Sequence, residues 1–239
     1  MKRKLAVAVA GTAAVAYGFW LRRRLRDWGT TVQDRSGRLP GDDMVADVSL
    51  QITQAVDIAA PPADVWPWLA QIGQGRGGFY SYDWLENLLG CDIHSAERIV
   101  EAWQDPRVGD EVRLIPPRQG GMEPKFEVLM VDPPHSLVLV TPGTPSGNRE
   151  EGLTYGTWAF ALQPVPGGGT HLVTRSRYEE WPSTIGRLID AAMEISQCVM
   201  QRKMLLGIKQ RAEGEARHPR IVEHPHIVVP ESERPPAWK

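Results

Sequence analysis

Asp92 and His94, with Glu97 one helical turn further on, form the part of the sequence that most resembles an acid/base pair. A metal site needs at least three protein ligands, and no other histidine is close to His94 in the sequence. We therefore favour a surface or helix-capping role for this cluster. The sequence contains no G-x-S-x-G, H-E-x-x-H or P-loop lysine pattern. These observations predict no catalytic set, no metal site and no cofactor.

Gly73, Gly75 and Gly78 match the G-x-G-x-x-G pattern of dinucleotide-binding sites. That mechanism requires a strand before the glycines and a helix after them, so that the pyrophosphate lies on the helix amino terminus. Here a predicted helix precedes the glycines, and the later strands are antiparallel. We therefore favour a turn that lets a second helix fold back close to the first. A third interpretation, in which this loop and Arg76 form part of a cavity mouth, remains open.

Three aromatic residues, Tyr80, Tyr82 and Trp84, follow this glycine-rich turn. Aromatic side chains with polar ends suit the rim of a pocket that meets both an apolar ligand and water. Packing of a short helix explains the same residues equally well. Both interpretations remain open for all three.

Two predicted strands place alternate residues on one face. One face carries Trp158, Phe160 and Leu162, and the next carries Leu172, Thr174, Ser176 and Tyr178. Paired inward, they form a wall that is apolar at one end and bears hydroxyl groups at the other, which would orient an amphiphile. Ordinary core packing explains Trp158 and Phe160 as well. Arg175 and Arg177 are expected on a solvated outer face.

Methionines on the last predicted helix, Met193, Met200 and Met204, would suit an adaptable cavity lining, although methionine is also common core filler. The candidate ligand-binding residues are Tyr80, Tyr82, Trp84, Trp158, Phe160, Ser176, Tyr178, Met193, Met200 and Met204.

The hydrophobic pattern predicts the elements that must position these residues. A strand is expected over 48–58, helices over 63–72 and 79–89, and a short helix around 96–103. From Val108 the period changes to two, and proline- and glycine-rich turns separate five strands. The predicted strands are 111–115, 125–131, 136–141, 156–162 and 170–178. Short connections imply antiparallel neighbours in one sheet.

The last predicted element is a long helix from Ser183 or Thr184 to about Ala212, with an unusually wide apolar face. An antiparallel sheet must bury one face, and only this helix is long enough to cover it. A curved sheet around one helix cannot close at both ends, so a cavity between them is expected. The fold class is α+β, with residues 48–212 as one helix-grip domain and 213–239 as an extended tail.

The amino-terminal segment 1–26 contains seven basic residues and no acidic residue, around an uncharged run from Leu5 to Leu21. As a helix this run spans about 25 Å, slightly less than a hydrocarbon core of about 30 Å. Phe19-Trp20 and the arginines 22–26 resemble an interfacial belt and a stop-transfer flank, so we favour a retained membrane anchor. A cleaved signal peptide and peripheral attachment remain alternatives. The flanking charges favour a body on the cytoplasmic side, and 27–47 is expected to be a linker.

Charge excludes one class of partner. The formal net charge is -2, but beyond residue 26 there are 20 basic against 29 acidic residues. An acidic body is a poor match for a phosphate backbone, so nucleic acid is not an expected partner. Cys91 and Cys198 are far apart in the sequence, which favours neither a disulfide framework nor a zinc site.

Four segments carry a resemblance to a known superfamily. They are "VDIAAPPADVWPWLAQIG", "GGFYSYDWLENLLG", "GTWAFALQP" and "MQRKMLLGIKQRAE". Together with the order of elements they resemble the SRPBCC superfamily, which includes START-type lipid-transfer domains and polyketide cyclase or dehydrase-like proteins. The resemblance covers about residues 48–212. It implies a helix-grip fold with an apolar ligand cavity, and it transfers no catalytic residue.

The expected function is binding or carriage of an apolar or amphiphilic small molecule, such as a lipid, an isoprenoid or a polyketide-like compound. Attachment to a membrane would place the protein near such a ligand. The alternative is a cyclase or dehydrase-type enzyme that uses His94, Tyr80 or Tyr178 as acid or base in the same cavity. A third possibility is an envelope-associated interaction module with a vestigial cavity.

Overall fold

The structure, a computed structural model, describes residues 17–18, 20–117, 124–142, 155–179 and 184–215. Side chains of the last helix are described from residue 194 to residue 214. Six antiparallel strands form one sheet in the order β1-β6-β5-β4-β3-β2. Their bounds are β1 Val48–Ile58, β2 Glu111–Arg113, β3 Lys125–Asp132, β4 Ser136–Val140, β5 Gly156–Val165 and β6 Gly169–Glu179. The predicted meander is confirmed, and the first strand completes it by pairing with the last.

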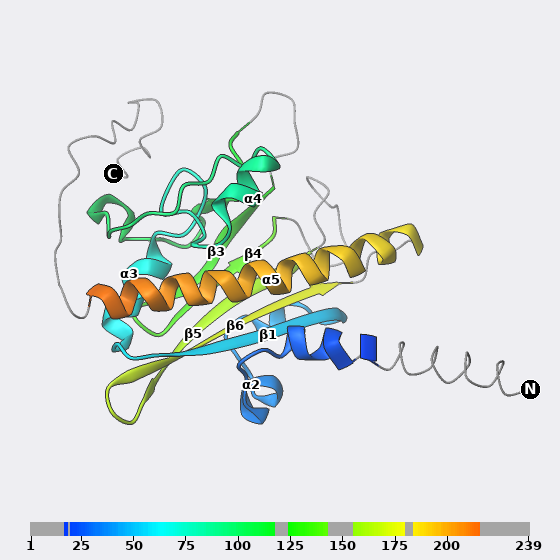
Figure 1. The fold of residues 1–239 in the computed structure, drawn as a ribbon, viewed down its shortest axis with the longest axis horizontal. Helices are drawn as coiled ribbons and strands as arrows, with labels where there is room; N and C mark the ends of the chain where they lie inside the picture. Colours follow the sequence, from blue (N-terminus) through cyan, green and yellow to red (C-terminus); the bar gives the residue numbers. More distant parts are fainter. Residues whose placement is uncertain (1–16, 19, 118–123, 143–154, 180–183, 216–239) are drawn as a thin grey trace, which may run out of the picture.

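Helix α5, Thr184–Glu215, lies across the sheet (Figure 1). Its 32 residues correspond to a rod of about 48 Å. In its carboxyl-terminal half, Leu205, Ile208 and Ala212 are fully buried. This arrangement confirms the predicted α+β helix-grip fold. The helix begins at Thr184, one of the two predicted starts. It ends at Glu215, three residues beyond the predicted end at Ala212.

Helices α3 (Pro62–Ala70) and α4 (Asp83–Leu88) and the 3-10 turn η2 (Glu101–Trp103) precede the meander. Pro62 occupies the first helical turn of α3, where its missing N–H is not needed. The helix buries Val65 and Leu69 against the core. In contrast, the apolar residues predicted to share one face of the second helix are mostly exposed, because α4 is shorter than predicted and lies at the surface.

The segment 27–47, predicted to be a linker, contains two short helices and packs on the domain. They are α2 (Val32–Ser36) and η1 (Asp42–Met44). A reciprocal capping box between Thr31 and Asp34 begins α2. The backbone N–H of Ala55 in β1 donates to the carbonyl oxygen of Trp28 at 3.0 Å. The linker prediction is wrong because the contacts that order this segment come from residues distant in the sequence.

Those contacts come from the outer face of β6. Arg175 is 3 % exposed and binds the carboxylate of Asp42 and the carbonyl oxygens of Asp34 and Gly37. Arg177 donates to the carbonyl oxygen of Asp42. Both arginines lie on the outer face as predicted, but segment 27–47 covers Arg175, so the predicted solvated face is wrong at that position.

The amino-terminal helical residues 20–26 bind the domain through arginines that the sequence suggested were a stop-transfer flank. Arg22 and Arg26 both bind the carboxylate of Glu194 on α5, which is 1 % exposed. Burial alone would raise the pKa of Glu194, but hydrogen bonds from Arg26 and Arg22 hold it below its usual value. None of the helices that the structure describes has the length and apolar character needed to cross a membrane. Residues 1–16 and 19 of the predicted anchor, and 216–239 of the predicted tail, lie outside the described residues.

Candidate functional site

The concave face of the sheet brings together the strand residues that the period of two had placed inward. Trp158 pairs with Ser176, Phe160 with Thr174, and Leu162 with Leu172 across β5 and β6. The Trp158 indole N–H also donates to Thr174 Oγ1 at 3.0 Å. The predicted inward pairing of the two strands is therefore confirmed.

One end of this face is filled by the core. Phe160 is fully buried, and Met204 on α5 is 2 % exposed in the same core cluster. Leu205 and Ile208 complete the packing between α5 and the sheet. In this structure Phe160 and Met204 are thus core residues, the second of the two interpretations that the sequence allowed.

The other end of the face is polar and includes residues that the sequence analysis missed. Ser176 Oγ donates to Gln201 Oε1 at 3.2 Å, and Gln197 Nε2 donates to Ser176 Oγ at 3.1 Å and to the Tyr178 hydroxyl oxygen at 2.8 Å. Gln54 on β1 donates to the carbonyl oxygen of Cys198 at 3.0 Å. Glutamines 197 and 201 are one helical turn apart, and this polar pair within an apolar helix is the signal that could have revealed them.

Two buried amide atoms at this end, Gln201 Nε2 and Gln54 Oε1, have no hydrogen-bond partner among the described residues. Burial raises the pKa of the Tyr178 hydroxyl, so this group stays protonated and can donate as well as accept. The polar end thus consists of neutral hydroxyl and amide groups.

Trp158 lies between the filled end and the polar end. Its ring centre is 5.0 Å from that of Phe160, 5.6 Å from that of Phe126 and 6.1 Å from that of Phe79. The three phenylalanines are buried, whereas Trp158 on the central strand β5 is only partly buried. Part of this indole therefore stays accessible, although it packs against three buried phenylalanines.

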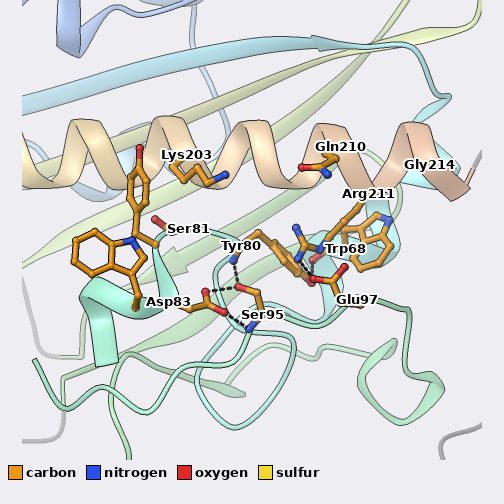
Figure 2. A pocket seen from close by; sticks show the side chains of 12 residues that line it. Trp68, Tyr80, Ser81, Asp83, Ser95, Glu97, Lys203, Gln210, Arg211 and Gly214 are labelled. Atoms are coloured by element: carbon orange, nitrogen blue, oxygen red, sulfur yellow. Dashed lines mark hydrogen bonds and ion pairs between the residues drawn. The ribbon is translucent and has the colours of Figure 1, made fainter. Parts of the chain in front are cut away.

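A hollow with a volume of about 780 Å³ lies along a flank of α5 (Figure 2). We call it the flank groove. It lies between α5, α3 and the segments 80–84 and 95–97, and it contains three of the predicted ligand-binding residues. The groove is lined by Trp68, Tyr80, Ser81, Tyr82, Asp83, Trp84, Ser95, Glu97, Lys203, Gln210, Arg211 and Gly214.

Tyr80 forms the buried floor of the flank groove. Its side chain is 1 % exposed, and its hydroxyl group donates to the carbonyl oxygen of Trp68 at 3.1 Å and accepts from Gln71 at 3.0 Å. Its backbone has a φ of 56°, a left-handed conformation that is unusual for a tyrosine. The Tyr80 N–H donates to Ser95 Oγ, which in turn donates to Asp83, and this network fixes the start of α4.

The remaining predicted residues are placed as follows. Met200 accepts a hydrogen bond from Ser81 through its carbonyl oxygen at 3.1 Å. Met193 belongs to α5, but its side chain lies outside the described residues. The side chains of Asp92 and His94 are 68 % and 80 % exposed, 3.2 Å apart, on the surface. Among the described residues no group of three or more potential ligands could hold a metal ion.

The glycine-rich loop forms the turn that the sequence favoured. Gly73 and Gly78 pair as an isolated antiparallel bridge, with φ values of 127° and 70°. Arg76 donates to the carbonyl oxygens of Ala70 and Trp103, so it stabilises the loop from within the protein. Arg76 is not among the residues that line the flank groove.

Comparison with known proteins relates the chain to one family. Residues 49–213 match the family described as polyketide cyclase / dehydrase and lipid transport. Curated protein sequences give no match. The chain is similar to solved structures of a Mesorhizobium loti protein, with 20 % identity, TM-score 0.38, and 68 % and 97 % of the two chains covered. A polyketide-cyclase-like protein of Corynebacterium glutamicum has 17 % identity, TM-score 0.40, and coverage of 72 % and 97 %. A Nitrosomonas europaea protein has 14 % identity, TM-score 0.45, and coverage of 72 % and 100 %.

The matched residues begin in β1 and end in α5, so they include nearly the whole sheet and the helix across it. The match spans more than half of the chain. The protein therefore belongs to the polyketide cyclase/dehydrase and lipid transport family, within the SRPBCC superfamily that its sequence resembles.

Proposed function

We propose that the protein binds and carries an apolar or amphiphilic small molecule, such as a lipid, an isoprenoid or a polyketide-like compound, between the sheet and α5. The incomplete burial of Trp158 is the observation that carries this proposal. An indole on the central strand of a helix-grip sheet is normally enclosed by core side chains, because burial of its large apolar area is favourable. In this protein the part of the Trp158 indole that stays accessible is available for contact with a ligand.

The polar end supports an amphiphilic ligand over a purely apolar one. Ser176, Tyr178, Gln197 and Gln201 provide hydroxyl and amide groups beside the indole. These groups are neutral, so they suit a hydroxyl, carbonyl or ester group better than a carboxylate or an ammonium group. The apolar body of the ligand would lie on Trp158, with its polar group toward α5.

The expected affinity follows from the buried area. Burial of about 300 Å² of apolar surface contributes about 7 kcal/mol before the loss of translational, rotational and side-chain freedom is subtracted. Micromolar binding requires about 8 kcal/mol, so apolar burial of this size is not sufficient and hydrogen bonds at the polar end must add to it.

Energy transfer to the neutral probe N-phenyl-1-naphthylamine tests the proposal. The probe should bind the full-length protein, and its tryptophan-excited emission should fall in the Trp158→Phe variant. Trp103→Phe is the matched control, because Trp103 lies in η2, outside both the sheet and α5. Equal emission from the two variants, or no binding of the probe, would contradict the proposal.

A cyclase or dehydrase-type activity remains the alternative prediction. Of its three candidate groups, His94 is on the surface and the Tyr80 hydroxyl group is used within the core. Only Tyr178 lies at the concave face, and burial raises the pKa of its hydroxyl, which makes it a poor base at neutral pH. Binding is therefore the better supported function. Attachment through residues 1–26, with the body on the cytoplasmic side, also stays a prediction.

A further inference from the structure

Both acidic residues of the flank groove are held by neighbouring side chains or backbone groups. Asp83 accepts hydrogen bonds from the N–H of Ser95 at 2.7 Å and from its hydroxyl group at 2.6 Å. Glu97 pairs with Arg211 at 2.9 Å, and the same guanidinium group lies 4.8 Å from the centre of the Tyr80 ring. These two carboxylates are thus bound by Ser95 and Arg211, and neither carboxylate forms an ion pair with Lys203.

Lys203 is the basic residue of the groove that forms no ion pair with a described residue. Its ammonium nitrogen lies 5.9 Å from the centre of the Tyr82 ring, and no carboxylate of the described residues lies within ion-pair distance of it. Figure 2 shows Lys203 and Gln210 projecting from α5 along the same groove. Lys209, six residues further along the helix, pairs instead with Glu213 at 3.3 Å. The ammonium group of Lys203 is thus available to an anionic group that enters the groove.

The groove also presents aromatic surface. Trp84 is 70 % exposed, although it is one of the largest apolar side chains of the protein, and Tyr82 is partly buried beside Lys203. Large exposed aromatic groups at a concave surface are typical of binding sites, because a flat ligand can stack on them. The Tyr82 hydroxyl and the Gln210 amide have no hydrogen-bond partner within the described part of the chain.

The shape of the groove depends on Gly207 and on the backbone conformation of Tyr80. Gly207 brings α5 against the backbone of Tyr80, where a Cβ would lie 2.3 Å from the Tyr80 carbonyl oxygen. The left-handed backbone of Tyr80 then turns the chain into segment 81–84, which carries the aromatic wall. Local strain of this kind persists only where the surrounding contacts fix it.

We propose that the flank groove is a second binding site, which takes a small organic anion with a flat apolar body, such as an aromatic carboxylate. The carboxylate pairs with Lys203, and the ring system stacks on Trp84 and Tyr82. A cationic ligand would be repelled by Lys203, and a neutral ligand would leave its ammonium group without a partner. The site lies on a different flank of α5 from the concave face, so it does not depend on the proposed function.

Isothermal titration of the full-length protein with 2-naphthoate tests this proposal, with the neutral 2-naphthalenemethanol as the matched ligand. The Lys203→Met variant should bind 2-naphthoate about three- to tenfold more weakly, the range expected for a partly exposed charge pair. Its affinity for the alcohol should not change. Lys203→Arg should restore binding of 2-naphthoate, and Trp84→Ala should weaken binding of both ligands.

Lys209→Met is the matched control, because it removes the same charge from the same helix outside the groove. The proposal is overturned if this variant weakens 2-naphthoate binding as much as Lys203→Met, or if Trp84→Ala has no effect. It is also overturned if 2-naphthoate does not bind while Lys203→Met reduces binding to phosphatidylglycerol vesicles, because Lys203 would then recognise a lipid headgroup. Trp158→Phe should leave 2-naphthoate binding unchanged, and a loss there would place the ligand at the concave face instead.

Discussion

Gly207 shows how one missing side chain sets the position of a whole helix. It lies in the middle of α5, where alanine is normally the better helix former by about 1 kcal/mol. A Cβ there would approach both the carbonyl oxygen and the Cβ of Tyr80, at 2.3 Å and 2.8 Å. The close approach of α5 to Tyr80 therefore requires glycine.

The Gly207→Ala variant should be destabilised by about 1–3 kcal/mol, because the helix must move away from Tyr80. Gly214→Ala on the same helix meets no atom within 4 Å, so it should be neutral or stabilising by up to about 1 kcal/mol. Urea denaturation of both variants measures the difference. Equal stabilities of the two would show that α5 can shift without loss.

Glu86 gives a prediction that depends on pH. Burial, helped by the nearby Asp83, raises its pKa to about 7, and its Oε2 has no hydrogen-bond partner among the described residues. The folded state therefore holds a proton on Glu86 that the unfolded state releases near pH 4.5, so stability falls as the pH rises from about 4.5 through 7. Glu86→Gln should be near neutral at pH 5 and stabilising by about 1–3 kcal/mol at pH 8.5.

The control for this experiment is Glu101→Gln, since Glu101 is exposed. Its effect on the free energy of unfolding should be small and the same at both pH values. A Glu86→Gln effect that does not change between pH 5 and pH 8.5 would show that Glu86 is already ionised in the folded protein at the lower pH.

At the scale of single residues, the sequence predicted which face of the sheet a side chain lies on better than it predicted how deeply the side chain is buried. Alternation along β5 and β6 placed Trp158 and Ser176 correctly, because a strand has no other way to orient successive side chains. It could not show that Tyr80 has a left-handed backbone and lies in the core, since both depend on packing against α5.

Among the elements, the helical residues 20–26 and α5 are joined by one buried carboxylate. Glu194 is bound by Arg22 and Arg26, and the carbonyl oxygen of Leu25 accepts a hydrogen bond from Gln54 of β1 at 2.7 Å. The amino-terminal segment is thus bound to α5 at Glu194, one turn before Gln197 at the polar end of the concave face.

Replacing both arginines with methionine should destabilise the protein by about 2–4 kcal/mol, because Glu194 would stay buried without a positive partner. Adding Glu194→Leu to that variant should recover a large part of the loss. Thermal unfolding of the double and triple variants checks this. If the third substitution lowers the melting temperature further, the carboxylate is stabilised by a group other than the two arginines.

The elements themselves were predicted where turn residues and periodicity agree, as in the meander and α5. They were missed where order comes from long-range polar contacts, as in α2 and η1, which are held by Arg175. Such contacts join residues more than a hundred positions apart and leave no local pattern in the sequence.

For the whole molecule, the attachment of segment 27–47 to the sheet should depend on pH. Burial alone would lower the pKa of His171, but hydrogen bonds to Asp57 and Asp34 outweigh it and raise the pKa above 6.5. This stabilisation is complete below pH 6.5 and is lost as the pH rises through the folded-state pKa. Burial would likewise raise the pKa of Asp34, but hydrogen bonds from Thr31 and His171 lower it, so its contribution is lost as the pH falls below 3.8.

His171→Gln should therefore lower the melting temperature more at pH 5.5 than at pH 9. Hydrogen exchange of residues 27–47 should show the same trend, with faster exchange at the higher pH after correction for intrinsic rates. A variant that loses the same stability at both pH values would mean that His171 acts only through packing and not through its charge.

In the whole molecule, α5 contributes to two candidate binding sites. Its sheet side meets the partly uncovered Trp158 and the neutral polar end, and its flank meets the groove with Lys203. The first was expected from the fold, since a curved sheet cannot close around one helix. The second was not expected, because only the structure brings Tyr82 and Trp84 next to Lys203.

Native mass spectrometry of the full-length protein, after incubation with a total lipid extract and removal of unbound lipid, tests the central claim most directly. The proposed function predicts one apolar or amphiphilic molecule per chain. It also predicts loss of that added mass in Trp158→Arg, a variant that places a charge at the uncovered indole, while Trp103→Phe retains it. Unliganded wild-type protein under these conditions, or the same retained mass in Trp158→Arg, would contradict ligand binding between the sheet and α5.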